Sequence, residues 1–169
     1  MQNKKFIVIS IVIGCIVVLV GIFFLWKWFR GGNGITHVVL DRSTYDVALT
    51  RATAWQPDAA LMKMTLADAS NGTWDFIFVS LKVKNKGLEV VANGQGVLRA
   101  DEIMIVGSGT ALPADSISPD EAMAKAHMVP GYGNATIVSL EMIYSAASRG
   151  WYWGVKTDAG VTITVKATP

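Results

Sequence analysis

The residues best suited to catalysis or metal binding are few and lie far apart in the sequence. The chain has two histidines, His37 and His127, and one cysteine, Cys15. Because zinc sites need clustered cysteine and histidine ligands, this spacing predicts no such site beyond residue 15. Ser108 is the one serine between two glycines, but it lacks the strand-turn-helix setting of a nucleophile elbow. We therefore expect no enzyme activity, no cofactor and no metal.

The paired carboxylates also favour structural roles over acid–base chemistry. Asp101 and Glu102 are neighbours on a predicted strand, where adjacent side chains point to opposite faces. Asp120 and Glu121 open a predicted helix, where negative charge complements the helix dipole.

The charge balance argues against a nucleic-acid partner. The whole chain carries a net charge of +2, but the residues from 35 onward hold 11 Lys and Arg against 13 Asp and Glu, which gives −2. A domain without a basic surplus lacks the electrostatic footprint of nucleic-acid binding.

An apolar segment near the amino terminus dominates the composition. Residues 6–26 contain no charge, and at the helical rise they would span roughly 31 Å, about one bilayer core. Aromatic and basic side chains suited to the headgroup level flank the segment; these predicted membrane-interface residues are Lys4, Lys5, Trp26, Lys27, Trp28 and Arg30. The sequence therefore predicts a transmembrane helix and a single-pass protein of the inner cell membrane. The lipid bilayer is then a partner, and the C-terminal domain is expected outside the cytoplasm.

Two other interpretations of this segment stay open. A cleaved signal peptide usually has a shorter apolar core and an Ala-x-Ala-like site, and neither is found here. Residues 12–15, Val-Ile-Gly-Cys, are similar to a bacterial lipobox, which would make Cys15 a site of lipidation. The residues after Cys15 stay apolar to residue 26, whereas a lipoprotein normally turns polar at this point.

The remaining sequence contains a repeat of about fifty residues. Each copy begins with a serine cap, at Ser43 and Ser118, followed three residues later by an acid and then by alanines four residues apart. Each predicted helix ends near a proline, Pro57 or Pro130, and alternating apolar residues then predict antiparallel strands with one wet face. We expect an α+β fold: an N-terminal transmembrane helix, then two tandem helix-plus-antiparallel-sheet halves that share a core.

Aromatic residues mark the second predicted strand of each half. Alternation places Trp74 and Phe76 of the first copy, and Trp151 and Trp153 of the second, on the core side, with Tyr152 on the opposite face. The lysines at every second position predict a basic strip on a sheet face or edge. The candidate partner-binding residues are Lys82, Lys84, Lys86, Tyr152, Thr162 and Thr164.

This pattern resembles the PepSY domain family. The resemblance rests on the Ala-x-x-x-Ala helix, the Pro-Asp or Pro-Gly stop, the Trp-x-aromatic strand and the glycine-led final strand, and residues 118–122, Ser-Pro-Asp-Glu-Ala, carry it best. It implies a bacterial cell-envelope domain that binds or restrains peptidases outside the cytoplasm, and it brings no catalytic residue. The chain then divides into a cytoplasmic tip with the anchor (1–30), a glycine-rich tether (31–42), a PepSY-like repeat (43–106), a linker (107–116) and a second repeat (117–169).

Together these features predict a membrane-anchored, extracytoplasmic binding or regulatory module with a protein or peptide partner. Such a module would bind peptides or restrain a peptidase, and an extended peptide could add to residues 160–165 if that strand lies at an edge. Two alternatives stay open. The chain could be an accessory subunit of a larger membrane complex, or a pilin-like filament subunit, although the usual prepilin signal is absent.

Overall fold

The computed structural model describes residues 34–168 of the 169-residue chain. The predicted transmembrane helix, the interface residues around it and Cys15 lie outside this range. Within residues 34–168, no helix is long and apolar enough to cross a membrane. The predicted location as a single-pass protein of the inner membrane therefore has no support in the described residues, because it rested on residues 6–26.

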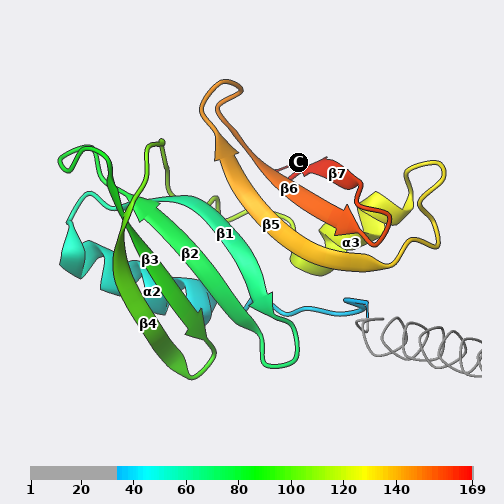
Figure 1. Ribbon diagram of the computed structural model, residues 1–169, viewed down its shortest axis with the longest axis horizontal. Coiled ribbons are helices and arrows are strands. Elements are labelled where there is room, and N and C mark those ends of the chain that lie inside the picture. Colours follow the sequence, from blue (N-terminus) through cyan, green and yellow to red (C-terminus); the bar gives the residue numbers. More distant parts are fainter. Residues whose placement is uncertain (1–33, 169) are drawn as a thin grey trace, which may run out of the picture. The chain divides into compact units, whose positions relative to one another are not determined.

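Helices and strands follow one another in an order that occurs twice along the described chain (Figure 1). One helix and four strands come first, and one helix and three strands follow. The elements are α2 (Arg42–Trp55), β1 (Ala60–Asp68), β2 (Thr73–Val79), β3 (Lys86–Asn93), β4 (Gly96–Met104), α3 (Pro119–His127), β5 (Ile137–Ser145), β6 (Gly150–Thr157) and β7 (Thr162–Lys166). We refer to α2 with β1–β4 as the first half and to α3 with β5–β7 as the second half.

All seven strands belong to one antiparallel sheet with the order β4-β3-β2-β1-β5-β6-β7. The predicted fold class, a transmembrane helix followed by two tandem helix-plus-antiparallel-sheet halves, is therefore wrong, because the described residues form one seven-stranded sheet with two helices. The two first strands, β1 and β5, pair with each other and make the sheet continuous. A repeat of this size has too little interior to stand alone, and pairing its first strands lets both copies bury one common core.

The pairing of β1 with β5 has the register of a local two-fold axis. Met64 lies opposite Met142, and the neighbouring pairs are Lys63 with Ile143 and Thr65 with Glu141. Within its own half, Met64 lies opposite Phe76 and Met142 lies opposite Trp153. Phe76 and Trp153 are therefore equivalent positions, and so are the flanking pairs Trp74 and Trp151, Asp75 and Tyr152.

The common core lies between the sheet and the two helices. The core-facing strand residues are fully buried, including Met64, Trp74, Phe76, Met142 and Trp153. The helix α2 covers them in the first half with Tyr45, Ala48 and Ala52, and α3 covers them in the second half with Ala122, Met123 and Ala126. The predicted core positions of the tryptophans are confirmed, since Trp74 and Trp153 are 0% exposed and Trp151 is 2% exposed.

Local sequence explains where each helix begins. Ser118 caps α3 as predicted: its Oγ accepts a hydrogen bond from the Glu121 amide at 3.1 Å, and Pro119 takes the first helical position. In α2 the cap is Asp41, whose carboxylate accepts from the Ser43 amide at 3.0 Å, so the helix begins earlier than the predicted Ser43 cap. An aspartate is as good a helix cap as a serine. The comparison of the two copies matched Ser43 with Ser118 and so overlooked Asp41.

Candidate functional site

The strand β7 forms one edge of the sheet. It pairs with β6 on one side, and no described strand pairs with it on the other. The Ala167 amide donates to the Trp151 carbonyl at 2.9 Å, which fixes the phase of the β6–β7 hydrogen bonds. In an antiparallel pair, every second residue directs its backbone N–H and C=O groups to the neighbouring strand. Ile163 and Val165 therefore bond to β6, as Ala167 does, and the backbone groups of Thr162 and Thr164 face the open edge.

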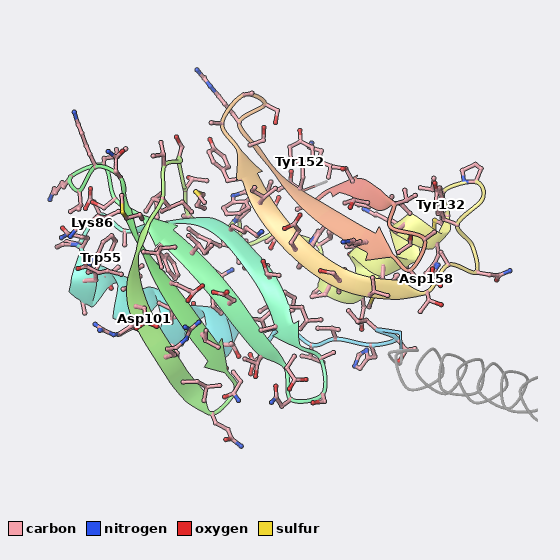
Figure 2. The ribbon with its side chains drawn as sticks, viewed as in Figure 1. Trp55, Lys86, Asp101, Tyr132, Tyr152 and Asp158 are labelled. Carbon is pink, nitrogen blue, oxygen red and sulfur yellow. The ribbon has the colours of Figure 1, made fainter. Side chains whose placement is uncertain are left out.

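The predicted residues of this region share the sheet face away from the helices. Thr162 and Thr164 are exposed, and Tyr152 lies half-buried on β6 (Figure 2). In the register, Gly154 stands opposite Thr164, and Tyr152 stands opposite Lys166. The structure therefore brings Tyr152, Thr162 and Thr164 together beside a strand edge with open backbone groups, with Lys166 at the end of the same strand.

The predicted lysine strip lies mostly outside the strands. Lys82 and Lys84 lie in the loop between β2 and β3, and Lys86 is the first residue of β3. The loop forms because the alternating pattern Lys-x-Lys-x-Lys contains Asn85, whose backbone adopts φ 58° and ends the extended conformation. These lysines lie in the first half, whereas Tyr152, Thr162 and Thr164 belong to the second, so the candidates form two separate surfaces.

Lys86 is held at the start of β3 by an ionic contact. Its Nζ lies 3.1 Å from the Glu102 carboxylate, which also accepts a hydrogen bond from the Trp55 indole at 3.0 Å. Figure 2 shows Trp55 and Lys86 at the same end of the first half. These two donors hold the pKa of Glu102 below its usual value. Among the residues that the structure describes, Lys82 and Lys84 make no ion pair within 4.0 Å.

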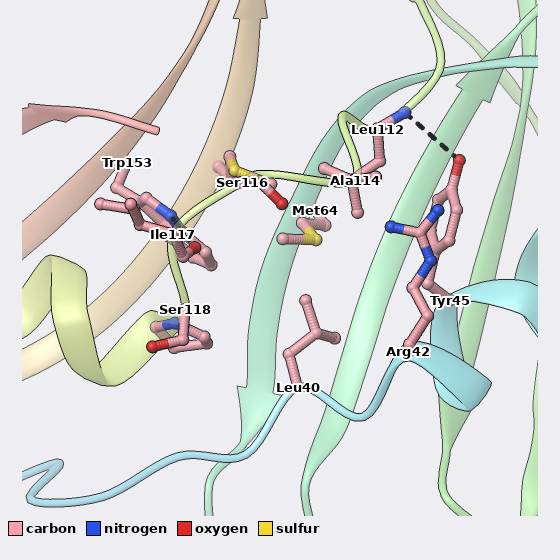
Figure 3. A pocket seen from close by; sticks show the side chains of 12 residues that line it. Leu40, Arg42, Tyr45, Met64, Leu112, Ala114, Ser116, Ile117, Ser118 and Trp153 are labelled. Atoms are coloured by element: carbon pink, nitrogen blue, oxygen red, sulfur yellow. Dashed lines mark hydrogen bonds between the residues drawn. The ribbon is translucent and has the colours of Figure 1, made fainter. Parts of the chain in front are cut away.

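A pocket of about 170 Å³ lies where the two halves meet, on the helix side of the sheet (Figure 3). Its floor is formed by the paired Met64 and Met142 with Trp153, and its rim by Leu40, Arg42 and the linker around Ile117. A dry cavity of about 150 Å³ is large enough for a benzene ring, so this pocket can accept one apolar side chain.

Two polar side chains border this pocket in the first half. The Arg42 guanidinium lies over the Tyr45 ring at 4.9 Å and reaches Asp46 at 3.5 Å. The Tyr45 hydroxyl accepts a hydrogen bond from the Leu112 amide at 3.5 Å, and burial raises its pKa, which keeps the hydroxyl neutral. No sequence pattern indicated this pocket, because its walls come from both halves and from the linker between them.

A cluster of charged side chains lies on the opposite sheet face of the first half. Arg99 contacts Glu89 at 2.6 Å and Asp101 at 3.3 Å. Asp75 lies half-buried beside Glu89, and burial together with the negative charge of Glu89 raises the pKa of Asp75 to about 6. Within residues 34–168, no group of three His, Cys, Asp or Glu side chains could hold a metal ion.

The two histidines have structural partners. The His37 Nδ1 lies 2.5 Å from Asp120, and the same carboxylate accepts a hydrogen bond from the Val38 amide at 2.9 Å. The His127 Nδ1 lies 3.1 Å from the Tyr132 carbonyl. These contacts tie the chain ahead of α2 to the start of α3 and the end of α3 to the loop that follows it.

Comparison with known proteins gives a likeness of fold. No protein-family model matches the chain, and no curated protein matches it. A similar solved structure is the crystal structure of a protein from Clostridium difficile 630 that is described as a "putative lipoprotein". The TM-score is 0.57 at 14% sequence identity, and the match covers 81% of this chain and 93% of that chain. The resemblance to the PepSY family gains no support from a family model.

Proposed function

We propose that this domain is a non-catalytic binding module that takes an extended peptide by adding it as a strand beside β7. The observation that carries the proposal is the open edge of β7, where the backbone groups of Thr162 and Thr164 have no strand partner among the described residues. Strand addition gains affinity from main-chain hydrogen bonds and specificity from the side chains that flank the edge. Tyr152 offers an aromatic surface on the same face as these threonines.

The other sheet edge is less suited to this role. The strand β4 carries Arg99, Asp101 and Glu102, and its pairing with β3 is interrupted by a register shift. Charged side chains and bulges are the features by which natural sheets protect an edge from further pairing. A peptide is therefore expected at β7 rather than at β4.

A proline substitution that spares the fold can test the edge. The full chain in mild detergent is used to select ligands from a random peptide display library, and the selected peptides are measured again with Thr164→Pro. This substitution removes an amide that faces the edge and leaves the β6–β7 hydrogen bonds in place, which is the position where strands tolerate proline. Loss of binding in a variant with native circular dichroism supports the proposal, and unchanged binding contradicts it.

A matched proline on the same strand serves as the control. Val165→Pro removes an amide that faces β6, so its main effect should be lower stability. In Val165→Pro, peptide binding should fall only in proportion to the fraction of unfolded protein. If binding also falls in Thr164→Pro while that variant stays folded, the effect is assigned to the edge.

The finer form of the proposal places this module outside the cytoplasm with a peptidase as its partner. Support comes from the PepSY resemblance of the repeat and from the likeness of fold to a protein described as a lipoprotein. Affinity purification of the full chain from membranes, with identification of the co-purified proteins, tests it. A co-purified peptidase supports the proposal; a stable complex of other subunits after gentle extraction supports the accessory-subunit alternative instead.

The lipobox-like residues 12–15 support a second proposal about attachment, namely lipidation of Cys15. Cells that express the chain are grown with labelled palmitate, and Cys15→Ser is the control. Label that is present in the natural chain and lost in Cys15→Ser supports lipidation, and absence of label in both contradicts it.

A further inference from the structure

The three most exposed large apolar side chains of the described chain lie together at one end of the first half. They are Leu81, Met104 and Val106, which are 90%, 89% and 82% exposed. Leu81 lies in the β2–β3 loop, whereas Met104 ends β4 and Val106 follows it. We call residues 80–86 and 103–107 the β2–β3 tip.

The two segments of the β2–β3 tip are joined by a hydrogen bond and a shared hollow. The Ile105 amide donates to the Asn85 carbonyl at 3.2 Å. Leu81, Val83 and Lys84 from one segment and Ile105 and Val106 from the other line a pocket of about 280 Å³. The tip is therefore a built surface rather than two unrelated loops.

The charges of the tip have one sign. Residues 80–86 and 103–107 contain three lysines and no acid. Two acids lie nearby. Glu102 contacts Lys86, and Asp58 accepts a hydrogen bond from the Ser80 hydroxyl at 2.8 Å, which together with the nearby charge of Lys82 lowers the pKa of Asp58. Towards the outer end, Leu81, Lys82, Val83 and Lys84 alternate apolar and basic side chains.

Other turns of the first half have a different composition. The β1–β2 turn contains Asp68, Ser70 and Asn71, and the β3–β4 turn is formed by residues 93–96, Asn-Gly-Gln-Gly. The β3–β4 turn, at the other end of the sheet, is followed by Leu98, which is less exposed than the apolar side chains of the tip, at 58%. The three most exposed apolar side chains of the described residues are thus gathered at one end of the sheet, the end of the β2–β3 tip. The β5–β6 turn lies at this same end (Figure 1), and its residues 146–149, Ala-Ala-Ser-Arg, add the exposed Arg149 and no acid.

We propose that the β2–β3 tip docks on the surface of an anionic lipid bilayer. Leu81, Met104 and Val106 enter the boundary between headgroups and acyl chains, and the ammonium groups of Lys82 and Lys84 bind lipid phosphates. Lysine suits this depth because its stem is apolar and its head stays in water. Binding of this kind draws on both buried apolar area and attraction to anionic lipids.

The arrangement of the side chains favours lipid over a folded protein partner. The apolar groups project from two segments and alternate with lysines, so each can insert separately into the fluid boundary between headgroups and acyl chains. A protein interface would instead be expected to have a continuous apolar centre with the charges at its rim. The lipid contact and the peptide edge at β7 are separate surfaces, so either one can fail without the other.

Site-specific photo-crosslinking of the full chain tests the proposal. The photoreactive residue p-benzoylphenylalanine replaces Leu81 in one variant and Met128 in the control. Met128 is 79% exposed and follows α3, ahead of the start of β5, so it lies at the opposite end of that strand from the β5–β6 turn. Each variant is reconstituted in vesicles of phosphatidylcholine alone or with equal phosphatidylglycerol, illuminated, and analysed by mass spectrometry for lipid adducts.

The expected result is a larger lipid adduct at position 81 than at position 128, increased by phosphatidylglycerol. Adding Lys82→Glu and Lys84→Glu to the position-81 variant should reduce this adduct to the level of the control. Equal adducts at both positions overturn the proposal, and so does insensitivity to both the anionic lipid and the charge reversal. Cross-linking in intact cells that gives protein adducts at position 81, without lipid adducts, also overturns it and identifies a protein surface instead.

Discussion

The two halves of the sheet share an order of elements but end differently. The first half continues past its third strand into β4, a nine-residue edge strand with charged side chains and a register shift. The second half stops at β7, a five-residue edge strand with two exposed threonines. Equivalent interior positions are apolar in both halves, whereas the two edges are formed by strands that are not equivalent, since β7 matches β3 and β4 has no counterpart in the second half. The two edges can therefore take different roles.

The first test of this comparison asks whether the two halves share one core. Trp153 of the second half is fully buried, meets Trp74 of the first half edge to face at 6.1 Å, and donates to the Ile117 carbonyl at 3.2 Å. We expect Trp153→Ala to lower the free energy of unfolding by about 3–5 kcal/mol, and Phe76→Ala at the equivalent position to do the same. Chemical denaturation followed by circular dichroism measures both.

The shape of the transition matters as much as its midpoint. A shared core requires one cooperative transition in both variants. Two separate transitions, with only the mutated half destabilised, would contradict it. Val161→Ala serves as the control, since Val161 is 38% exposed and should change stability by less than about 0.5 kcal/mol.

Glycines at strand positions give the second comparison. A Cβ on Gly87 of β3 would lie 2.7 Å from the Phe78 carbonyl oxygen, which cannot move without its strand. A Cβ on Gly154 of β6 would meet the flexible Glu141 side chain at 3.1 Å. We expect Gly87→Ala to cost about 1–3 kcal/mol and Gly154→Ala to be tolerated, as judged from urea midpoints. Similar losses in both variants would show that the packing of the first half is not the tighter one.

The third comparison concerns Asp75 and its equivalent, Tyr152. The pKa of Asp75 is raised from 3.8 to about 6 in the fold, so between about pH 4 and pH 6 the unfolded chain releases this proton while the folded chain keeps it. The folded state therefore loses stability as the pH rises through this window, and no penalty exists below it. After allowance for solvent at this half-buried site, Asp75→Asn should gain about 1 kcal/mol at pH 7 and nothing at pH 4.

Urea unfolding at both pH values checks this expectation. Tyr152→Phe is the matched control and should leave the pH dependence unchanged, because it alters the equivalent position without removing a carboxyl group. A gain in Asp75→Asn that is equal at pH 4 and pH 7 would mean that the effect is one of packing and not of titration.

Sequence reasoning succeeded where the pattern was local and failed where partners came from distant segments. Alternation was enough to orient Trp74, Tyr152 and Trp153, because the side-chain period of a strand is fixed by its geometry. The pairing of β1 with β5 could not be inferred in this way. Alternation shows which face of a strand is buried, but it does not show which strand lies beside it. The lysines were misplaced for a related reason: alternation of Lys with other residues occurs in a loop as readily as in a strand.

The candidate surfaces divide along the same line. Peptide addition to residues 160–165 was predicted on the condition that this strand lies at a sheet edge, and β7 does lie there. The condition was a natural one, because a terminal strand of a meander commonly ends a sheet. The central pocket and the β2–β3 tip were not foreseen. The two segments of the tip are separated in the sequence by β3 and β4, and the walls of the pocket come from both halves and the linker. Only folding brings these segments together.

The smallest expected effect tests what joins the two halves. Lys63 and Glu141 are equivalent positions across the local two-fold axis, yet they carry opposite charges and their side chains meet at 2.7 Å. In an exact repeat these positions would carry the same charge, so their divergence allows an ion pair that spans the junction. Both side chains are about a third exposed, and we therefore expect Lys63→Met to cost less than about 1 kcal/mol.

Charge reversal sharpens this expectation. Lys63→Glu places two carboxylates across the junction and should cost more than Lys63→Met, and the double variant Lys63→Glu with Glu141→Lys should recover most of the loss. Denaturation at low and at high salt measures the three variants, and the difference should shrink at high salt because screening weakens exposed pairs. If Lys63→Met instead costs as much as a buried tryptophan, the junction depends on the ion pair. A small loss leaves the buried apolar residues at the junction, the paired Met64 and Met142 and the rings of Trp74 and Trp153, as the main link between the halves.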